Sequence, residues 1–394
     1  MRALLRKEVG RCACWADYGR GIILMQRKRL NVMSDYRVVL INSMDQWAET
    51  HTAWNGLLGQ SSADTIFLTW EWLFSWGENY LDADRCLFIV MVYKNDELVG
   101  IAPWYIQSLR RGALTVKQIS FLGAPDAGSD YLDVIIKKGQ EQKVANFLHE
   151  FLLTEARNRW DSCMLEDLPS NSLFLLYFLT TIEDAGKYAE IRQCSFCPTV
   201  VLPKKGEDLM SLYSSNRRQQ YRRHLKLLRN EGELQHEIFT GERVGEAFGA
   251  FCNLYETKNE HHDKSVRSFL SSYASRCSDE RALRVDLFSS NGKLIGGLLH
   301  LKHQDTLGMY LMAVDKEYNP NISLGNILVG LCLSGAIEDG VAIYDFLKGI
   351  EPYKFHWADR GRTSVTLSYY QKNVSSLLLV AEKFLKYTAK VVLR

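Results

Sequence analysis

The stretch Asn95-Asp-Glu-Leu-Val-Gly100 has a near copy further along the chain, Asn291-Gly-Lys-Leu-Ile-Gly296, which begins 196 residues later. Each stretch follows an apolar run and leads into another. Asn-Asp and Asn-Gly pairs tolerate the positive φ angles of tight hairpin turns. Each stretch therefore predicts a β-hairpin, and the pair predicts that the chain contains two copies of one α/β unit.

The residues after each hairpin extend the match. In the first half we expect a strand over residues 131–136 and then a helix, because the apolar residues from Val144 onward recur at helical spacing. In the second half a strand over 307–314 precedes a helix over 324–339 that Ser323 caps. A further strand follows each helix. Helix-rich segments are expected before the two copies, over residues 45–58, 70–80, 208–229 and 244–258.

Each copy is therefore predicted to be an α/β (α+β) domain with a mixed sheet flanked by helices. Because 394 residues exceed the size of one ordinary domain, we expect domains over residues 33–202 and 203–394. Residues 1–32 carry eight basic and two acidic side chains and lack the apolar centre of a signal peptide. We expect a disordered basic leader or the product of an upstream start codon.

The composition is that of an ordinary soluble protein, with 46% hydrophobic residues, 24% charged residues and a net charge of +2. This balance gives no global sign of nucleic-acid binding, and no apolar run reaches the length of a membrane span. Cys194-Ser-Phe-Cys197 lacks the second cysteine pair of a zinc site. We therefore expect two strand cysteines, no metal, and a reducing, cytoplasmic compartment.

The link before the helix at residue 324 is a local candidate for a ligand site. Pro320 and Asn321 end the preceding strand, and Gly325 lets a ligand approach the backbone. Free N–H groups and the helix dipole make such a helix start a natural seat for phosphate, although many links of this kind are only caps. The corresponding helix start near Gly139 has no glycine in its first turn. A phosphorylated ligand is therefore expected in the second copy.

The segment 216–229 carries six Lys or Arg residues and no acid. Tyr221, Leu225 and Leu228 recur at helical spacing, so one face of this helix packs and the other is purely positive. A charge run usually marks a solvated face, but such faces are normally mixed in sign. We expect this helix to meet phosphates or an anionic polymer, and RNA would also fit.

Charged and aromatic side chains crowd the loop that follows Tyr344-Asp-Phe-Leu347. Such a loop grips a polar ligand or, as a structural alternative, clamps two domains with Lys348 and Glu351 paired. In the first copy Asp130 stands at the start of a strand, where it either caps a turn or faces a cleft. His300 is expected to be a satisfied interior residue, and the tryptophans at helical spacing in 70–76 are expected to form core or a cleft wall.

Several of these segments, in their order, resemble a known family. The carrying motifs are Phe67-Leu-Thr-Trp-Glu-Trp72, the run ending at Pro103, Phe121-Leu-Gly123 with Ser129-Asp-Tyr131, the basic helix, and residues 345–354, which fit Asp-Phe-x-x-Gly-x-x-x-Tyr-Lys. Together they resemble the CelD-type branch of the GNAT acyltransferase superfamily, which is related to the Fem peptidoglycan aminoacyltransferases. The resemblance covers nearly all of 33–357 and implies tandem GNAT folds with splayed sheets.

The resemblance implies transfer of an acyl group, expected to be acetyl, from acyl-CoA to an amine of an amino sugar or similar small acceptor in exopolysaccharide or envelope metabolism. Of the usual pyrophosphate loop, Arg/Gln-x-x-Gly-x-Gly/Ala, only Gly325 has a counterpart here. Two alternatives stay open: aminoacyl transfer from charged tRNA, as in Fem relatives, and an inactive accessory protein of polysaccharide synthesis. The expected cofactor-binding residues are Val314, Ile322, Ser323, Leu324, Gly325 and Asn326.

Further roles follow from what acyl transfer to an amine requires. Asp130 or Glu351 is expected to take the proton of the amine, and Lys348 or Tyr353 to hold the acceptor. Backbone N–H groups of residues 311–314 would stabilise the oxyanion, and GNAT catalysis also works by proximity alone. The expected catalytic residues are Asp130, Lys348 and Glu351, and the expected substrate-binding residues are Arg217, Arg218, Tyr353, Lys354 and Trp357.

Overall fold

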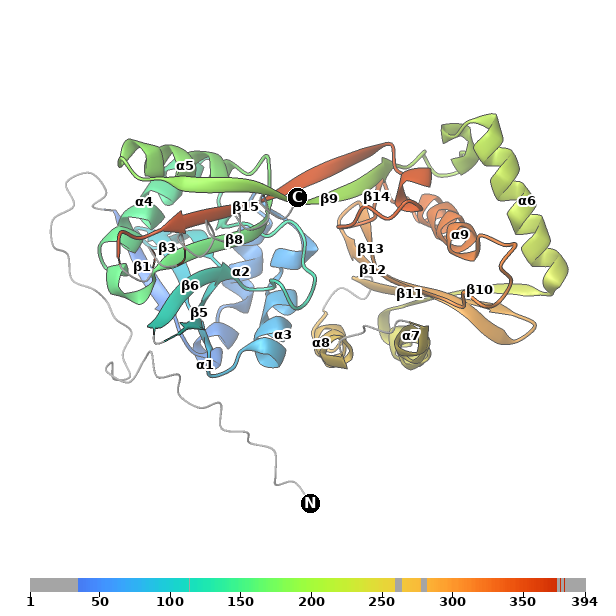
Figure 1. The fold of residues 1–394 in the computed structure, drawn as a ribbon, viewed down its shortest axis with the longest axis horizontal. Helices are drawn as coiled ribbons and strands as arrows, with labels where there is room; N and C mark the ends of the chain where they lie inside the picture. Colours follow the sequence, from blue (N-terminus) through green and yellow to red (C-terminus); the bar gives the residue numbers. More distant parts are fainter. Residues whose placement is uncertain are drawn as a thin grey trace, which may run out of the picture. The chain divides into compact units, whose positions relative to one another are not determined.

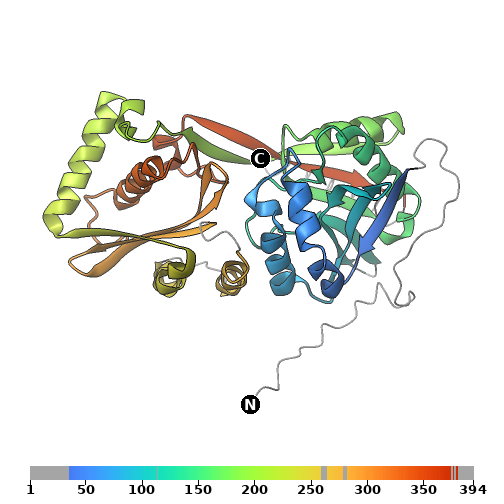
Figure 2. The ribbon, with the colours of Figure 1, turned by 180° about the vertical axis from the view of Figure 1, so that it is seen from behind.

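The computed structural model describes residues 35–112, 114–258, 264–277 and 282–373 together with Ser376 and Leu379, so the expected leader lies outside them. The chain forms two compact units, seen from opposite sides in Figures 1 and 2. Unit 1 is drawn from Met1–Cys194 and Ser364–Arg394, and unit 2 is Ser195–Thr363. This division departs from the expected domains 33–202 and 203–394 because the last strand returns to unit 1, which no local pattern indicates.

Unit 1 contains an antiparallel sheet in the order β1 (Tyr36–Ile41), β3 (Ile89–Lys94), β4 (Glu97–Ala102) and β7 (Ile135–Ile136). A second group of strands follows the order β15 (Arg360–Tyr370, entering from unit 2), β8 (Ser162–Pro169), β6 (Leu114–Phe121), β5 (Trp104–Arg111) and β2 (Arg85–Leu87). The helices are α1 (Met44–Ala48), α2 (His51–Leu58), α3 (Trp70–Tyr80), α4 (Glu141–Leu153) and α5 (Leu173–Asp184), with 3-10 turns η2 (Ile66–Leu68) and η3 (Arg157–Arg159).

Unit 1 confirms part of the sequence prediction and corrects part of it. The helix expected over 70–80 is α3, and its three tryptophans are buried, as core residues should be. The helix expected over 45–58 is divided into α1 and α2 by a turn at Glu49 and Thr50. The strand expected over 131–136 keeps only its last two residues, because Tyr131 has a φ of 55°, outside the extended region.

Unit 2 is built on strands in the order β10 (Leu234–Thr240), β11 (Leu283–Ser290), β12 (Lys293–His303), β13 (Thr306–Val314), β14 (Ile343–Asp345) and β9 (Ala189–Val201, which begins in unit 1). Neighbours are antiparallel except β13 and β14, which are parallel. The helices are α6 (Ser215–Glu231), α7 (Val244–Lys258), α8 (Lys264–Ala274) and α9 (Leu324–Glu338), with 3-10 turns η4 (Leu209–Leu212), η5 (Gly241–Arg243) and η6 (Lys354–His356).

Helices cover both faces of the unit 2 sheet. Gly296 and Gly297 are neighbours on β12, so side chains there would point to opposite faces. A Cβ at Gly296 would collide with Leu328 of α9, and one at Gly297 would lie 3.0 Å from Phe251 of α7. Thus α9 packs on one face and α7 on the other, which buries an apolar core along α9.

The predicted duplication is present in detail. Asn95 and Asn291 both adopt the left-handed φ that their hairpin turns require, 54° and 51°. In each hairpin the strand pairing shifts register at the same position, just before Tyr93 in unit 1 and just before Ser289 in unit 2. Gly100 also matches Gly296, because a Cβ there would meet a valine of α4 at 2.7 Å. Turn, bulge and helix-contacting glycine therefore recur together.

Two smaller expectations concern cysteines and membranes. Cys194 and Cys197 both lie on β9, as predicted for strand residues. Within the part of the chain that the structure describes, every helix is too short or too polar to cross a membrane.

Candidate functional site

The sheet of unit 2 opens between β13 and β14. The two strands pair in parallel only from Thr306 with Ile343 to Gly308 with Asp345, and β13 then continues to Val314 while β14 ends. The pairing of β13 with β12 shifts register at Tyr310, so the edge strand is bulged there. Every second peptide group of an edge strand points away from its one neighbour, so this opening presents backbone donors and acceptors.

The helix that follows β13, α9, begins at this opening, and some backbone amides of its first turn have no hydrogen-bond partner among the described residues. The side chain of Ser323 makes no capping hydrogen bond to α9, and its hydroxyl accepts a hydrogen bond from Asn326 Nδ2 at 3.1 Å. Its backbone N–H donates to His224 Nδ1 at 3.3 Å, and Leu324 N–H donates to Ile322 O. In the described chain the amides of Gly325 and Asn326 have no hydrogen-bond partner. The first turn of α9 also contains no acid.

A pocket of about 470 Å³, its open mouth included, lies at this helix start. One wall is α6, whose residues 217, 220, 221 and 224 follow helical spacing toward α9. The floor and the other wall come from the first turn of α9 and from η6. The lining residues are Met210, Tyr213, Arg217, Gln220, Tyr221, His224, Ser323, Asn326, Ile327, His356 and Trp357.

Aromatic packing fixes the pocket walls. Tyr213 and Tyr221 meet the ring of Trp357 edge-on, at centroid distances of 5.3 and 5.5 Å. The Tyr213 hydroxyl donates to the Trp357 carbonyl at 2.9 Å, and burial raises the pKa of both tyrosines above the ordinary value, so they remain protonated donors. A Cβ at Gly330 would collide with Tyr221, so this glycine lets α6 approach α9.

The structure brings four of the predicted site residues together around this pocket and leaves the others elsewhere. Arg217, Ser323, Asn326 and Trp357 line it, and Arg217 Nη1 donates to the His356 carbonyl at 3.1 Å. The other predicted residues lie elsewhere. Ile322 and Leu324 belong to the apolar core, Gly325 is half-buried in the first turn of α9, and Val314 ends β13. Arg218 lies on α6 outside the pocket lining, Tyr353 is half-buried after β14, and Asp130 is buried in unit 1.

The loop after β14 corrects the expected pairing of Lys348 with Glu351. Glu351 instead forms an ion pair with Lys354, at 3.1 Å. Lys354 is 4% exposed, and its Nζ donates to the carbonyls of Lys348 and Leu347 at 2.7 and 3.3 Å. The ammonium group of Lys354 therefore ties residues 347, 348 and 351 of this loop together. The sequence around Lys354 gave no sign of this structural role.

Sequence reasoning missed most of the pocket lining. Tyr221 was placed on the packing face of the basic helix, and Tyr221 and Leu228 do pack as expected. Counting the helical spacing from Arg217 would have placed Gln220 and His224 on the same face of the helix as Arg217, and all three line the pocket. His356 and Tyr213 have no comparable signal, because tertiary contacts bring them in.

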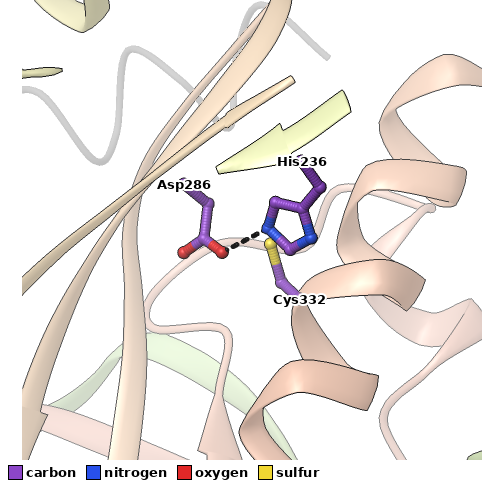
Figure 3. Close-up of side chains that lie close together, drawn as sticks. All are labelled: His236, Asp286 and Cys332. Carbon is purple, nitrogen blue, oxygen red and sulfur yellow. Dashed lines mark hydrogen bonds and ion pairs between the residues drawn. The ribbon is translucent and has the colours of Figure 1, made fainter. Parts of the chain in front are cut away.

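A second polar cluster is buried between β10, β11 and α9 (Figure 3). His236 Nε2 donates to Asp286 Oδ1 at 2.7 Å, and the Cys332 thiol lies close enough to both for the three to hold a metal ion. Arg284 donates two 2.8 Å hydrogen bonds to the same carboxylate. A metal ion would thus compete with a buried guanidinium for Asp286.

The same cluster explains His300. Its Nε2 lies 2.8 Å from the Tyr344 hydroxyl, and its Nδ1 lies 3.1 Å from Asp286 Oδ2 in an ion-pair contact. His300 is therefore an interior residue, as predicted. Burial by itself would raise the pKa of Asp286, but the bonds from His236, His300 and Arg284 hold that pKa well below its usual value. Asp286 therefore stays ionised as the centre of a buried ion-pair network.

With this geometry in view, residues 215–355 match the family model of the acetyltransferase (GNAT) domain. Unit 2 contains a GNAT acetyltransferase domain. The match spans most of unit 2, including the opening between β13 and β14 and the start of α9. This domain supports the predicted N-acyltransferase activity.

Solved structures show the same fold over most of the chain. FemX is similar over 82% of this chain and 96% of its own, with 10% identity and a TM-score of 0.55. The C-terminal domain of a putative lysylphosphatidylglycerol synthetase from Agrobacterium fabrum matches over 87% and 97%, with 12% identity and a TM-score of 0.51. L-PGS from Bacillus licheniformis matches over 84% and 94%, with 11% identity and a TM-score of 0.50.

At such identities these likenesses concern the fold alone. A comparison with proteins of curated function gave no match. Together with the GNAT domain and the repeated hairpin, bulge and helix, the likenesses confirm the predicted fold class, an α/β protein of tandem GNAT-like folds.

Proposed function

We propose that unit 2 is the catalytic half of the chain and transfers an acyl group, acetyl in the simplest case, from acyl-CoA to an amine. The observation that carries this proposal is the start of α9, where the amides of Gly325 and Asn326 have no partner within the described residues and an acid-free pocket adjoins. Such amides and the helix dipole attract a diphosphate. The GNAT domain makes CoA the natural source of that diphosphate.

Two pocket side chains would take part in donor binding. Arg217 uses one N–H on the His356 carbonyl, and a guanidinium has five N–H donors in all, which leaves others for a phosphate. His224 accepts the Ser323 amide. A diphosphate that used this amide as well would displace the imidazole.

The acyl-transfer step forms a C–N bond at the thioester carbonyl, breaks the C–S bond and releases the proton of the amine. The open edge of β13, over residues 311–314, is proposed to supply N–H donors to the carbonyl oxygen as it becomes negative. One such donor is worth about 3–4 kcal/mol where removal has been measured. Holding both substrates at this edge adds the advantage of proximity.

Glu351 is our candidate for the group that accepts the proton of the amine. Asp130, the other residue expected in this role, is fully buried in unit 1. Glu351 is exposed, and buried Lys354 holds its carboxylate in place. Replacing Glu351 by Gln keeps the shape and removes the base, so kcat should fall by about 10²–10⁴. An unchanged kcat in E351Q would contradict this role.

The acceptor is proposed to be an amine of an amino sugar or similar small molecule, in exopolysaccharide or envelope metabolism. This part rests on the resemblance of residues 345–354 and the motifs before them to the CelD-type branch, whereas the comparisons reach the GNAT domain and the fold. Lys348 and Tyr353, which flank Glu351 in the loop, are proposed to hold this acceptor.

The donor is tested by incubating the purified chain with deuterated acetyl-CoA and glucosamine, an amino-acid amide or a polyamine, and by following the products by mass spectrometry. We expect one amine to gain the labelled acetyl group and CoA to raise the melting temperature. An absence of both transfer and stabilisation would contradict the proposal. Stabilisation without transfer to any amine would favour an inactive accessory protein.

One observation favours aminoacyl-tRNA as a second candidate donor. The side of α6 away from the pocket carries Arg222, Arg223, Lys226 and Arg229, all exposed, and FemX shares the fold. A tRNA complex should weaken steeply as salt rises and should be lost when Arg217, Arg218, Arg222 and Arg223 are replaced by Gln. Replacing exposed Arg110 and Arg111 of β5 is the matched control, and equal binding by both variants would reject this candidate.

A further inference from the structure

The cluster of His236, Asp286 and Cys332 combines three kinds of metal ligand (Figure 3). An imidazole nitrogen, a carboxylate oxygen and the thiol sulfur lie within 4.8 Å of one another. Among the residues that the structure describes, no other set of three His, Cys, Asp or Glu side chains is gathered as closely. The expectation of no metal rested on the Cys194–Cys197 pair, whereas this set comes from three segments far apart in the chain.

The strand register brings two of these ligands to one face of the sheet of unit 2. His236 of β10 pairs with Phe288 of β11, so Asp286, two residues before Phe288, is its diagonal neighbour on the same face. The His236 ring stacks on Phe288 at a centroid distance of 4.2 Å, which fixes its plane. The helix α9 covers this face and contributes Cys332, whose thiol lies beside the other two groups (Figure 3). Core packing therefore holds the three ligands in place.

The ligand types favour zinc. A thiolate, an imidazole and a carboxylate suit Zn²⁺, whereas Mg²⁺ and Ca²⁺ take oxygen ligands. Tetrahedral zinc places its ligand atoms about 3.3–3.6 Å apart, so the widest separation here closes by roughly 1 Å at most. His236 Nε2 and Asp286 Oδ1 are 2.7 Å apart, so the ion would replace the hydrogen bond between them. Three protein ligands leave the fourth zinc position to water.

Arg284 lowers the affinity of this site without closing it. A carboxylate has about four lone-pair sites, and Arg284 uses one on each oxygen of Asp286. Zinc needs the site that now accepts from His236, so the guanidinium can stay as an outer hydrogen-bond partner, which carboxylates that bind metals usually have. Arg284 also donates to Asp339 at 2.7 Å, so two carboxylates share one guanidinium. A zinc ion that displaces the thiol proton of Cys332 adds one net positive charge and balances them.

We propose that His236, Asp286 and Cys332 bind a zinc ion that joins β10 and β11 to α9. The side chain of His236 is 21% exposed, whereas those of Asp286 and Cys332 are fully buried, so the ion enters from the His236 side. The thiol proton of Cys332 is released to solvent as the Zn–S bond forms. The inference does not depend on the proposed acyl transfer, and its tests do not measure transfer.

The first test uses the metal-free full chain with one equivalent of Zn²⁺ or Co²⁺. Co²⁺ binds sites of this kind and absorbs by charge transfer when a thiolate is a ligand. We expect this absorption with Co²⁺ and its loss when Zn²⁺ is added. X-ray absorption of the zinc complex should show one sulfur at about 2.3 Å and nitrogen or oxygen at about 2.0 Å. A zinc shell without sulfur, or with two sulfurs, would overturn the inference.

Thermal unfolding of the same wild-type chain adds a measurement that needs no spectroscopic probe. An ion that binds the folded chain raises its melting temperature in proportion to the logarithm of the ion concentration above Kd. We expect this rise with Zn²⁺ and none with Mg²⁺. Equal rises with both ions would contradict a site that contains a thiolate.

The second test compares Cys332→Ser and His236→Gln with the matched control Cys252→Ser, whose thiol is buried on α7 at the other face of the sheet. We expect the cobalt absorption to vanish in Cys332→Ser and zinc to bind at least tenfold more weakly in both site variants. Cys252→Ser should keep the absorption and bind zinc within twofold of wild type. Unfolding of the metal-free variants checks that they fold.

His236→Gln decides the test if Cys332→Ser does not fold, because position 236 is partly exposed and glutamine can keep a hydrogen bond to Asp286. Wild-type zinc affinity in His236→Gln would reject the site. Cobalt absorption that persists in a folded Cys332→Ser, or that is lost in Cys252→Ser, would place the metal at another thiol and would also reject it.

Discussion

The two copies of the unit differ most where their equivalent helices begin. In unit 1 the Gly139 amide, just before α4, donates to the side chain of Glu141 at 2.7 Å, so the chain places its own carboxylate at the helix start. In unit 2 the first turn of α9 contains no acid, and two of its amides have no partner among the described residues. One copy thus pairs its helix start with its own carboxylate, and the other does not.

The strands before these helices differ in the same sense. In unit 1 β7 has two residues, both paired with β4. In unit 2 β13 has nine residues and extends well beyond its pairing with β14. The hairpin, the bulge and the helix-contacting glycine are common to both copies. The comparison teaches that the duplicated scaffold is kept in both units, whereas the long edge strand and the acid-free helix start are found in unit 2.

If unit 1 is mainly a scaffold, the protonation of its buried side chains should change the stability of the fold and leave donor binding unchanged. Burial raises the pKa of Asp133 to about 7, against bonds from Ser172 and from the Val134 amide that lower it. The folded chain therefore holds this proton more tightly than the unfolded chain. The contribution of protonated Asp133 to the free energy of unfolding is full below pH ~4. It decreases by up to about 4 kcal/mol as the pH rises to ~7.

Asp133→Asn should remove that pH dependence and thus be more stable than wild type at pH 8, with a much smaller gain at pH 4. Urea unfolding across this range measures the difference. Parallel stability curves for the variant and wild type would show that Asp133 titrates alike in both states and would contradict the assignment.

The shared glycines provide the next comparison between units. Gly296→Ala and Gly100→Ala should each destabilise by about 1–3 kcal/mol, since overpacked helix–sheet contacts cost this much. Gly296→Ala should be the worse, because the added Cβ comes closer to Leu328 than that at Gly100 does to Val144. Each glycine substitution can be combined with a shorter partner side chain, Leu328→Val for Gly296→Ala and Val144→Ala for Gly100→Ala. In urea unfolding, each double variant should lose less stability than the sum of its two single variants. Strictly additive effects would mean that these contacts do not set the helix position.

The turn asparagines give the smallest expected difference. Both have a left-handed φ, so alanine should cost about 1 kcal/mol at either turn. Asn291 also accepts from the Glu233 amide and donates to the Glu231 carbonyl, so Asn291→Ala should cost about 1 kcal/mol more than Asn95→Ala. Glycine should restore stability at 95 and only partly at 291. Equal effects at both turns in thermal unfolding would remove this distinction between the copies.

How much the sequence could predict follows from the range of the interactions involved. The hairpins at Asn95 and Asn291, the helix α3 and the start of α9 were predictable, because neighbouring residues determine turns and helical spacing. The smaller part of the pocket was predictable: Arg217, Ser323, Asn326 and Trp357 were expected to bind a ligand. Tyr213 and His356 were missed, and Lys354 was expected to be available, because these positions depend on contacts between segments far apart in the chain.

The most direct test of the account is titration of CoA into wild type and variants that carry the same substitution in each copy. At Gly325 a Cβ would lie 3.7 Å from Met312, so Asp and Asn both fit, and only Asp adds a carboxylate as Glu141 does in unit 1. Gln142, exposed in the first turn of α4, is the equivalent position. We predict one CoA per chain, at least tenfold weaker binding (about 1.4 kcal/mol) in Gly325→Asp, and little change in Gly325→Asn or Gln142→Asp. Wild-type affinity in Gly325→Asp, or loss of binding in Gln142→Asp, would contradict a donor seat on α9.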